Sequence, residues 1–249
     1  PARRPTPARI RNAPAATAPA PEATELLLGL PATSDVELRQ AIRQGLPFSA
    51  LEAVSQQLDL STQQCGLLLG IPARTVARRK EARQLNPQES DRLYRLARAT
   101  TQAVAILGSL DHARRWPDDD GIETLRFGLA LVRGTPFSGA TYSWNDATGL
   151  STDAAMLVVR SATLLAEMCA DAGDDEGVYW ATAQGLLALP GHESLIALRL
   201  RAHARRGDRA GLATEWRSYL RFLATDPWSN AQPSPDMLRV WEEVGGTEH

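Results

Sequence analysis

The sequence predicts an all-α protein made of two helical modules. Apolar residues recur three and four positions apart through much of the chain, which is typical of amphipathic helices, and capping patterns precede several of these stretches. A Gly-Asp turn occurs twice, as Ala172-Gly173-Asp174 and as Arg206-Gly207-Asp208, with a spacing of 34 residues. A period of this length, with a helical pattern on both sides of the turn, is typical of paired-helix repeats.

Residues 1–34 are predicted to form a disordered tail. Within them, residues 1–24 contain six prolines, eight alanines and four arginines, and Glu22 is the one acidic residue. A segment of this composition buries too little apolar surface to offset the entropy lost on ordering. We interpret it as a solvated linker or, alternatively, as a basic arm that lies along phosphates.

Start and stop signals predict five helices and no strand between Asp35 and Trp116. Asp35 is the expected N-cap of the first helix, and Ser61 with Gln64 forms a capping-box pattern before the third. The predicted helices are Val36–Gln44, Phe48–Leu58, Thr62–Leu69, a basic helix that starts at Pro72, and a long helix that starts after Asn86.

The long helix has a strong start signal, because Asn86-Pro87-Gln88-Glu89 combines a cap, a proline at the first position and a glutamate at the third. One side of this helix carries a mainly apolar stripe that consists of Leu93, Leu96, Ala97, Thr100, Val104 and Leu107. We expect a protein partner to bind here, through Leu93, Leu96, Val104, Leu107 and Trp116. A second stripe, Arg92, Arg95 and Arg98, is interpreted as a solvated or partner-facing surface.

The acidic turn Pro117-Asp118-Asp119-Asp120-Gly121 is the predicted boundary, which gives a front module of residues 35–116 and a rear module of residues 117–249. Residues 1–116 contain 16 Arg and Lys against 10 Asp and Glu, whereas residues 117–249 contain 11 against 19. This asymmetry predicts contact with nucleic acid by the front part of the chain only.

The rear module is predicted to contain a helix, a turn-rich loop, two repeated helix pairs and a C-terminal helix. The predicted ranges of the helix, the loop and the C-terminal helix are Ile122–Val132, Gly134–Gly149 and Pro235–Val244. At the offset of the two Gly-Asp turns, Leu164 matches Leu198 and Gly177 matches Gly211. This repetition predicts a tetratricopeptide-like fold, in which neighbouring helices cover the ends of the array.

The most informative segment of the front module is residues 74–83, which contains five basic residues, one acidic residue and the only lysine of the protein. It follows a turn, Gly70-Ile71-Pro72, and the turn follows a short apolar helix. A helix, a turn containing glycine and a second helix with basic residues near its start form the layout of a DNA-binding helix-turn-helix. Such a helix fits the major groove and carries arginines to guanine edges.

Helical geometry divides these side chains into two predicted roles. Arg74 and Arg78 are four positions apart and share a face, and Thr75 lies on the adjacent one. We therefore expect Arg74, Thr75 and Arg78 to contact base edges, and Val76 to point into the module. The expected phosphate contacts are Arg79, Lys80 and Arg83.

The stretch from Gly45 to Trp116 resembles the Xre/MbcA/ParS-type antitoxins of bacterial toxin–antitoxin pairs. The likeness implies a helix-turn-helix that binds the promoter of its own operon. It also implies a helical domain, starting at Asn86 here, that covers a RES-type toxin which consumes NAD. After Trp116 the sequence departs from the family pattern, so we expect weak toxin binding or none. The motifs that carry the likeness are Gly45-Leu46-Pro47, Leu67-Leu68-Leu69-Gly70-Ile71-Pro72, Arg74-Thr75-Val76-Ala77-Arg78-Arg79-Lys80, Leu85-Asn86-Pro87-Gln88-Glu89-Ser90-Asp91-Arg92-Leu93, Leu96-Ala97-Arg98 and Ala113-Arg114-Arg115-Trp116.

Residues 122–244 resemble a second family, the bacterial transcriptional activator domain. This is the tetratricopeptide-type module of actinobacterial antibiotic-regulatory proteins, and the likeness implies that the rear module mediates protein contacts within a regulator. The motifs that carry it include Leu129-Ala130-Leu131-Val132-Arg133-Gly134-Thr135-Pro136-Phe137, Tyr142-Ser143-Trp144, Leu164-Leu165-Ala166-Glu167, Gly185-Leu186-Leu187-Ala188-Leu189-Pro190-Gly191-His192-Glu193 and the two Gly-Asp turns.

The sequence contains no recognisable catalytic, cofactor-binding or metal-binding motif. The four histidines have no ligand-like spacing with cysteines or carboxylates, and there is no P-loop and no dinucleotide-binding glycine pattern. Cys65 and Cys169 are expected to be reduced core thiols, and no apolar run approaches the ~18 residues of a membrane span. We therefore expect a cytoplasmic protein that is not an enzyme and that needs no cofactor and no metal.

These observations predict a DNA-binding transcriptional regulator that acts through a helix-turn-helix and makes protein contacts through a helical repeat domain. The expected partners are promoter or operator DNA, a protein such as a RES-type toxin or the transcription machinery, and further copies of this chain in a homo-oligomer. Two alternatives stay open: an antitoxin of a RES-type toxin–antitoxin pair, and a protein-interaction scaffold that does not bind DNA.

Overall fold

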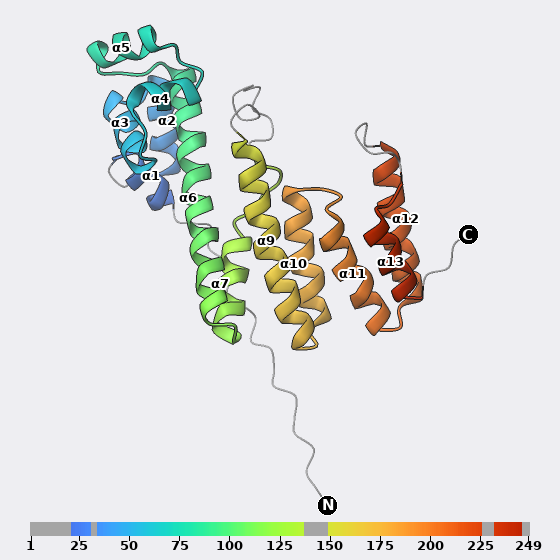
Figure 1. The fold of residues 1–249 in the computed structure, drawn as a ribbon. Coiled ribbons are helices and arrows are strands. Elements are labelled where there is room, and N and C mark those ends of the chain that lie inside the picture. Colours follow the sequence, from blue (N-terminus) through green and yellow to red (C-terminus); the bar gives the residue numbers. More distant parts are fainter. Residues whose placement is uncertain (1–20, 31–33, 137–148, 226–231, 246–249) are drawn as a thin grey trace, which may run out of the picture.

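The computed structural model describes residues 21–30, 34–136, 149–225 and 232–245, and every regular element within these ranges is an α-helix. The predicted all-α class is therefore confirmed. Figure 1 shows a cluster of short helices at one end, a long helix α6 (Pro87–Arg115) beside it, and a row of further helices on the other side of α6.

The cluster of short helices packs around one hydrophobic core, to which α6 contributes its first turns. Among its fully buried side chains are Leu46, Leu51, Leu69 and Leu93. Its helices are α1 (Pro21–Leu27), α2 (Asp35–Gln44), α3 (Phe48–Gln57), α4 (Thr62–Leu68) and α5 (Ala73–Ala82).

Between Asp35 and Trp116 the predicted helix starts are confirmed to within one residue, but the cap of the first of these helices differs. Ser61 with Gln64, and Asn86 with Glu89, form capping boxes as predicted. The cap of α2 is Ser34 rather than Asp35, because the Ser34 side chain accepts from the backbone N–H of Glu37 and the Glu37 carboxylate accepts from the backbone N–H of Ser34. A serine with a glutamate three residues later satisfies two backbone groups at once, which an aspartate at the next position cannot do.

The predicted disordered tail is wrong in its last part. Residues 21–27 form α1, which packs against α3 and α6, and Leu28 is buried in the front core. The apolar side chains at the end of this segment provide the burial that the proline-rich part lacks. Residues 1–20 and 31–33 lie outside the described ranges.

The predicted boundary at residue 117 does not coincide with a boundary between hydrophobic cores. A helix of this length spans about 43 Å, and α6 contributes to two cores along it. Leu93, Leu96 and Ala97 belong to the front core, whereas Ile106, Leu110 and Ala113 belong to a second core with the helices that follow. The two cores therefore meet within α6, before the acidic turn.

Beyond α6, a row of helices forms the rest of the molecule (Figure 1). The first, α7, packs closely along α6, since a Cβ at Gly128 would lie 2.6 Å from Ser109 Oγ. Its start is Asp119, three residues before the predicted one, and Asp118 caps it. The helices are α7 (Asp119–Leu129), α9 (Leu150–Asp171), α10 (Asp175–Ala188), α11 (Glu193–Arg205), α12 (Arg209–Thr225) and α13 (Pro235–Glu243). The predicted loop Gly134–Gly149 lies mostly outside the described residues.

The two Gly-Asp turns have the same construction, one between α9 and α10 and the other between α11 and α12. The Asp174 carboxylate accepts from the backbone N–H of Gly177, and the Asp208 carboxylate accepts from that of Gly211, both at 2.9 Å. A Cβ at either glycine would lie 2.2 Å from the aspartate Oδ2. The matching residues of the sequence repeat are therefore required by the same local geometry.

Candidate nucleic-acid interface

The helices α4 and α5 form the helix-turn-helix that the sequence predicts. The turn between them contains Gly70 with φ of +67°, and the backbone N–H of Ile71 donates to the Gly66 carbonyl at 2.8 Å. Val76 of α5 is buried as predicted and lies against Gly66, where a Cβ would be 2.4 Å from Val76 Cγ2. Close approach of the two helices thus depends on a residue without a side chain at position 66.

The C-terminal end of α5 is fixed by backbone contacts with the α2–α3 connection. Arg83 ends the helix in the left-handed region, with φ of +55°, and its carbonyl accepts from the backbone N–H of Phe48 at 3.0 Å. The backbone N–H of Leu85 donates to the Leu46 carbonyl at 2.9 Å. Together with the turn at Gly70, these bonds fix α5 at both ends, so that its outer face has a defined orientation.

The outer face of α5 exposes most of the residues that the sequence assigns to DNA. Arg74, Arg78 and Arg83 are exposed, and Thr75 is half-buried. Within the described residues, none of the three arginines has an ion-pair partner. Lys80 is exposed and lies 3.9 Å from the exposed Glu52, a separation at which a surface ion pair contributes little.

The start of α5 adds partial positive charge to this face. Its N-cap is Pro72, which provides no side-chain hydrogen bond to the helix. The backbone N–H of Thr75 donates to the Pro72 carbonyl at 2.8 Å, which leaves those of Ala73 and Arg74 without a capping side chain. The helix dipole makes this end favourable for an anion such as a phosphate.

Arg79 does not fit its predicted phosphate contact. Its Nε donates to both carboxylate oxygens of Glu89, at 2.7 and 3.1 Å, and the Glu89 side chain is only 8% exposed. Glu89 also accepts from the backbone N–H of Asn86 in the capping box of α6. Arg79 therefore links α5 to the start of α6, and sequence spacing could not reveal this pairing because it depends on how the two helices meet.

The predicted partner-binding residues divide into two groups. Leu93 and Leu96 are buried in the front core, so they cannot meet a partner and this part of the prediction is wrong. Val104 and Leu107 of α6 are 59% and 46% exposed, and Trp116, which follows α6, is 55% exposed, so these side chains are accessible. An apolar stripe along a helix can be recognised in the sequence, but the sequence does not show which part of the stripe packs against other helices of the same chain.

The arginine stripe of α6 also divides. Arg92 donates to the Leu69 carbonyl at 3.0 Å and so holds the end of α4, and Arg95 pairs with Asp91 at 2.9 Å. Arg98 is exposed. The role of Arg92 is one that sequence reasoning missed, since the end of α4 comes near it only in the folded module.

The described part of the chain contains no cluster of His, Cys, Asp and Glu that could hold a metal ion. Cys65 and Cys169 are unpaired and buried, and burial raises the pKa of both thiols. Among the described helices, none is long and apolar enough to cross a membrane. The exposed basic face of α5 is therefore the strongest candidate site.

Comparison with protein families finds that residues 37–98 match the antitoxin Xre-like helix-turn-helix domain. The match covers α2 to α5 and the first turns of α6, which are the elements that position the basic face. It supports the predicted antitoxin-type helix-turn-helix over about a quarter of the chain. No curated protein and no solved structure matches the chain.

Proposed function

We propose that the chain is a transcriptional regulator that binds a specific DNA sequence through α5. The observation that carries this proposal is the exposed face with Arg74, Thr75 and Arg78, which α4 and the α2–α3 connection hold at the outer edge of the molecule (Figure 1). In a helix-turn-helix, the residues near the start of the second helix contact base edges in the major groove. The match to an antitoxin Xre-like helix-turn-helix domain supports the same role.

Selection from a pool of random duplex DNA tests this function. We expect the full chain to enrich a short common sequence, and we expect a variant with Arg74→Ala and Arg78→Ala to enrich none. Arg95→Ala with Arg98→Ala is the matched control, because it removes two arginines from an exposed face of α6 and should leave the enriched sequence unchanged. Failure of the full chain to enrich any sequence would favour the scaffold alternative.

We assign protein contacts to the helices that follow α6, in a tetratricopeptide-like module. The two Gly-Asp turns support this assignment, because each has the same hydrogen bond between its aspartate and a glycine three residues later. Each turn joins a pair of antiparallel helices, and the two turns are 34 residues apart in the sequence. Helix pairs of this kind present extended surfaces to partners. The resemblance to the bacterial transcriptional activator domain points to partners within the transcription machinery.

The antitoxin function is the second candidate, because the matching domain is of the antitoxin type. Val104 and Leu107 of α6, and Trp116 just after it, are exposed and are available to a toxin. Ile106, Leu110 and Ala113 of the same helix are already covered, which reduces the surface that remains for a complex burying more than about 1,000 Å². Co-expression with a RES-type toxin is the test: we expect no protection of cellular NAD, and full rescue of growth would place the antitoxin function first.

A further inference from the structure

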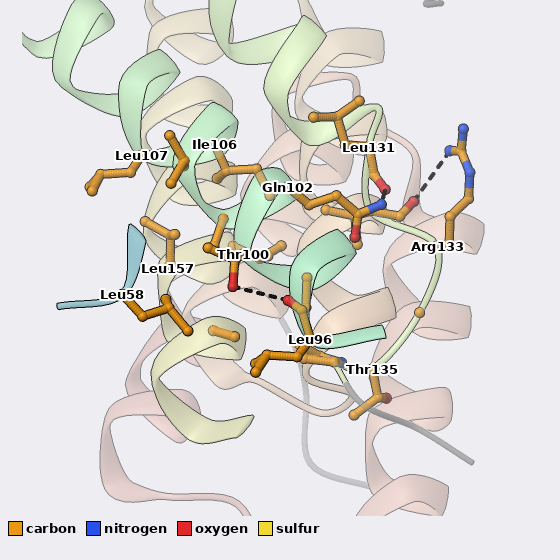
Figure 2. A pocket seen from close by; sticks show the side chains of 18 residues that line it. Leu58, Leu96, Thr100, Gln102, Ile106, Leu107, Leu131, Arg133, Thr135 and Leu157 are labelled. Atoms are coloured by element: carbon orange, nitrogen blue, oxygen red, sulfur yellow. Dashed lines mark hydrogen bonds between the residues drawn. The ribbon is translucent and has the colours of Figure 1, made fainter. Parts of the chain in front are cut away.

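An apolar pocket lies where the two hydrophobic cores meet along α6. Its volume is about 430 Å³, which is within the range of sites for small molecules. Figure 2 shows walls formed by the middle of α6, with Leu96, Ile106 and Leu107, by Leu157 of α9, and by Leu131 after α7. Leu58, just beyond α3, closes one side.

The polar groups of the pocket wall are few and mostly engaged. Thr100 Oγ1 donates to the Leu96 carbonyl at 2.9 Å, as is usual for a threonine within a helix. Gln102 Nε2 donates to the Leu131 carbonyl at 3.5 Å. The interior therefore offers mainly aliphatic surface, and it suits an alkyl chain better than a polar molecule.

Arg133 is the one charged residue among the 18 that line the pocket, and it lies at its edge in Figure 2. Its side chain is exposed, and its guanidinium donates to the carbonyls of Ala130 and Val132. Within the described residues no carboxylate pairs with it. A guanidinium can bind a carboxylate through two parallel hydrogen bonds, so Arg133 can hold the anionic end of a ligand whose body lies in the pocket.

From this arrangement we infer that the pocket binds an amphipathic carboxylic acid, namely a medium-chain fatty acid. Its alkyl chain lies between α6 and α9, and its carboxylate pairs with Arg133. The aliphatic wall favours an alkyl chain, and Arg133 at the edge favours a ligand with a negative charge. This site is distinct from the basic face of α5, and its existence does not depend on the proposed binding of DNA.

Isothermal titration calorimetry of the full chain with octanoate, decanoate and 1-decanol tests this inference. We expect saturable binding of one decanoate per chain, with an affinity that rises about fourfold for each methylene added between octanoate and decanoate. Arg133→Gln should weaken decanoate binding by about tenfold or more and leave 1-decanol binding unchanged. Arg160→Gln is the matched control, because Arg160 is exposed on α9 outside the pocket wall.

A second pair of variants tests the position of the alkyl chain. Ala154 lines the pocket and Thr152 is exposed on the same helix outside it, so Ala154→Trp should abolish binding and Thr152→Trp should retain it. Circular dichroism confirms that each variant is folded. The inference is overturned if the unmodified chain shows no saturable binding. Equal effects of a variant and its matched control would overturn it as well.

Discussion

At the scale of single residues, the basic helix contains two kinds of arginine that the sequence cannot distinguish. Arg74 and Arg78 extend from the outer face, whereas Arg79 is turned toward α6 and pairs with the buried Glu89. All three lie within five positions of one another, so the difference arises from the angle at which α5 meets α6. Arginines that are free on the surface and an arginine that links two helices are thus close neighbours in the sequence.

The first prediction concerns readout of DNA by these side chains. Arg74→Ala or Arg78→Ala should weaken binding to the selected sequence by about 1–3 kcal/mol and relax its base preference, because a bidentate contact with a guanine edge is lost. Lys80→Ala should weaken binding to all sequences alike. It should also reduce the slope of the logarithm of the binding constant against the logarithm of the salt concentration by about one. Fluorescence anisotropy over a range of salt concentrations measures both effects. Binding that is insensitive to all three substitutions would reject α5 as the reading helix.

The second prediction concerns the ion pair of Arg79 and Glu89. Arg79→Ala should lower the free energy of unfolding by about 2 kcal/mol, since it leaves a mostly buried carboxylate without its charged partner. The pair Arg79→Met with Glu89→Gln should recover part of this loss, because the double variant leaves no uncompensated charge. Urea unfolding measures these free energies. A double variant that is less stable than Arg79→Ala alone would contradict this account.

At the scale of helices, one carboxylate joins α11 and α12 to the start of α13. Glu193, at the start of α11, accepts hydrogen bonds from Ser234 before α13 and from Tyr219 of α12. Burial raises the pKa of Glu193, but the hydrogen bonds from Ser234 and Tyr219 together outweigh it, so the pKa lies below its ordinary value. Met237 and Trp241 of α13 are buried on this side, where Trp241 stacks on Trp216 with ring centroids 4.5 Å apart.

The third prediction is a dependence of this contact on pH. A carboxyl group whose pKa is lower in the folded than in the unfolded state stabilises the folded state. This stabilisation is complete above the pKa of the unfolded state, about 4.3, and is lost as the pH falls through the pKa of the folded state. The free energy of unfolding should therefore decrease as the pH falls from about 5 to 3. Glu193→Gln should be less stable at pH 6 and should show a smaller decrease. Urea titrations across this range measure both slopes, and equal slopes for the two proteins would rule out a role for Glu193.

At the scale of the whole molecule, α6 joins the helix-turn-helix end to the row of paired helices without an independent linker. Its first turns complete the front core and its last turns complete the second. The apolar pocket lies between these two regions of α6, so its walls come from both parts of the molecule. The two modules of the sequence are therefore parts of one continuous packing arrangement.

The fourth prediction follows from this sharing of α6. A fragment of residues 118–249 loses the buried contacts of Ile106, Leu110 and Ala113, and should be destabilised by about 3–6 kcal/mol relative to a fragment of residues 99–249. This amount is a large share of the 5–15 kcal/mol of an ordinary domain. Thermal unfolding followed by circular dichroism compares the two fragments. Equal midpoints would show that the second core is complete without α6.

The sequence alone determined the helical class, most helix starts and the location of the DNA-binding candidate. These features depend on local chemistry: the capping boxes at Ser61 and Asn86, the turn at Gly70, and the glycines that the two aspartate turns require. Each lies within a few residues of the groups that it satisfies, so the chain order already contains the information.

Only the tertiary structure decided which side chains of a helix are exposed to solvent and where along α6 the front core gives way to the second core. Arg79 pairs with Glu89 across the junction of two helices. Leu93 and Leu96 are buried, whereas Val104 and Leu107 are exposed. Helix α1 packs against α3 and α6, although the composition of residues 1–34 predicted disorder. The junction of the two cores lies inside α6, although the charge pattern changes after Trp116. These outcomes depend on contacts between segments far apart in the chain, and periodicity along one helix contains no information about which neighbour covers each of its turns.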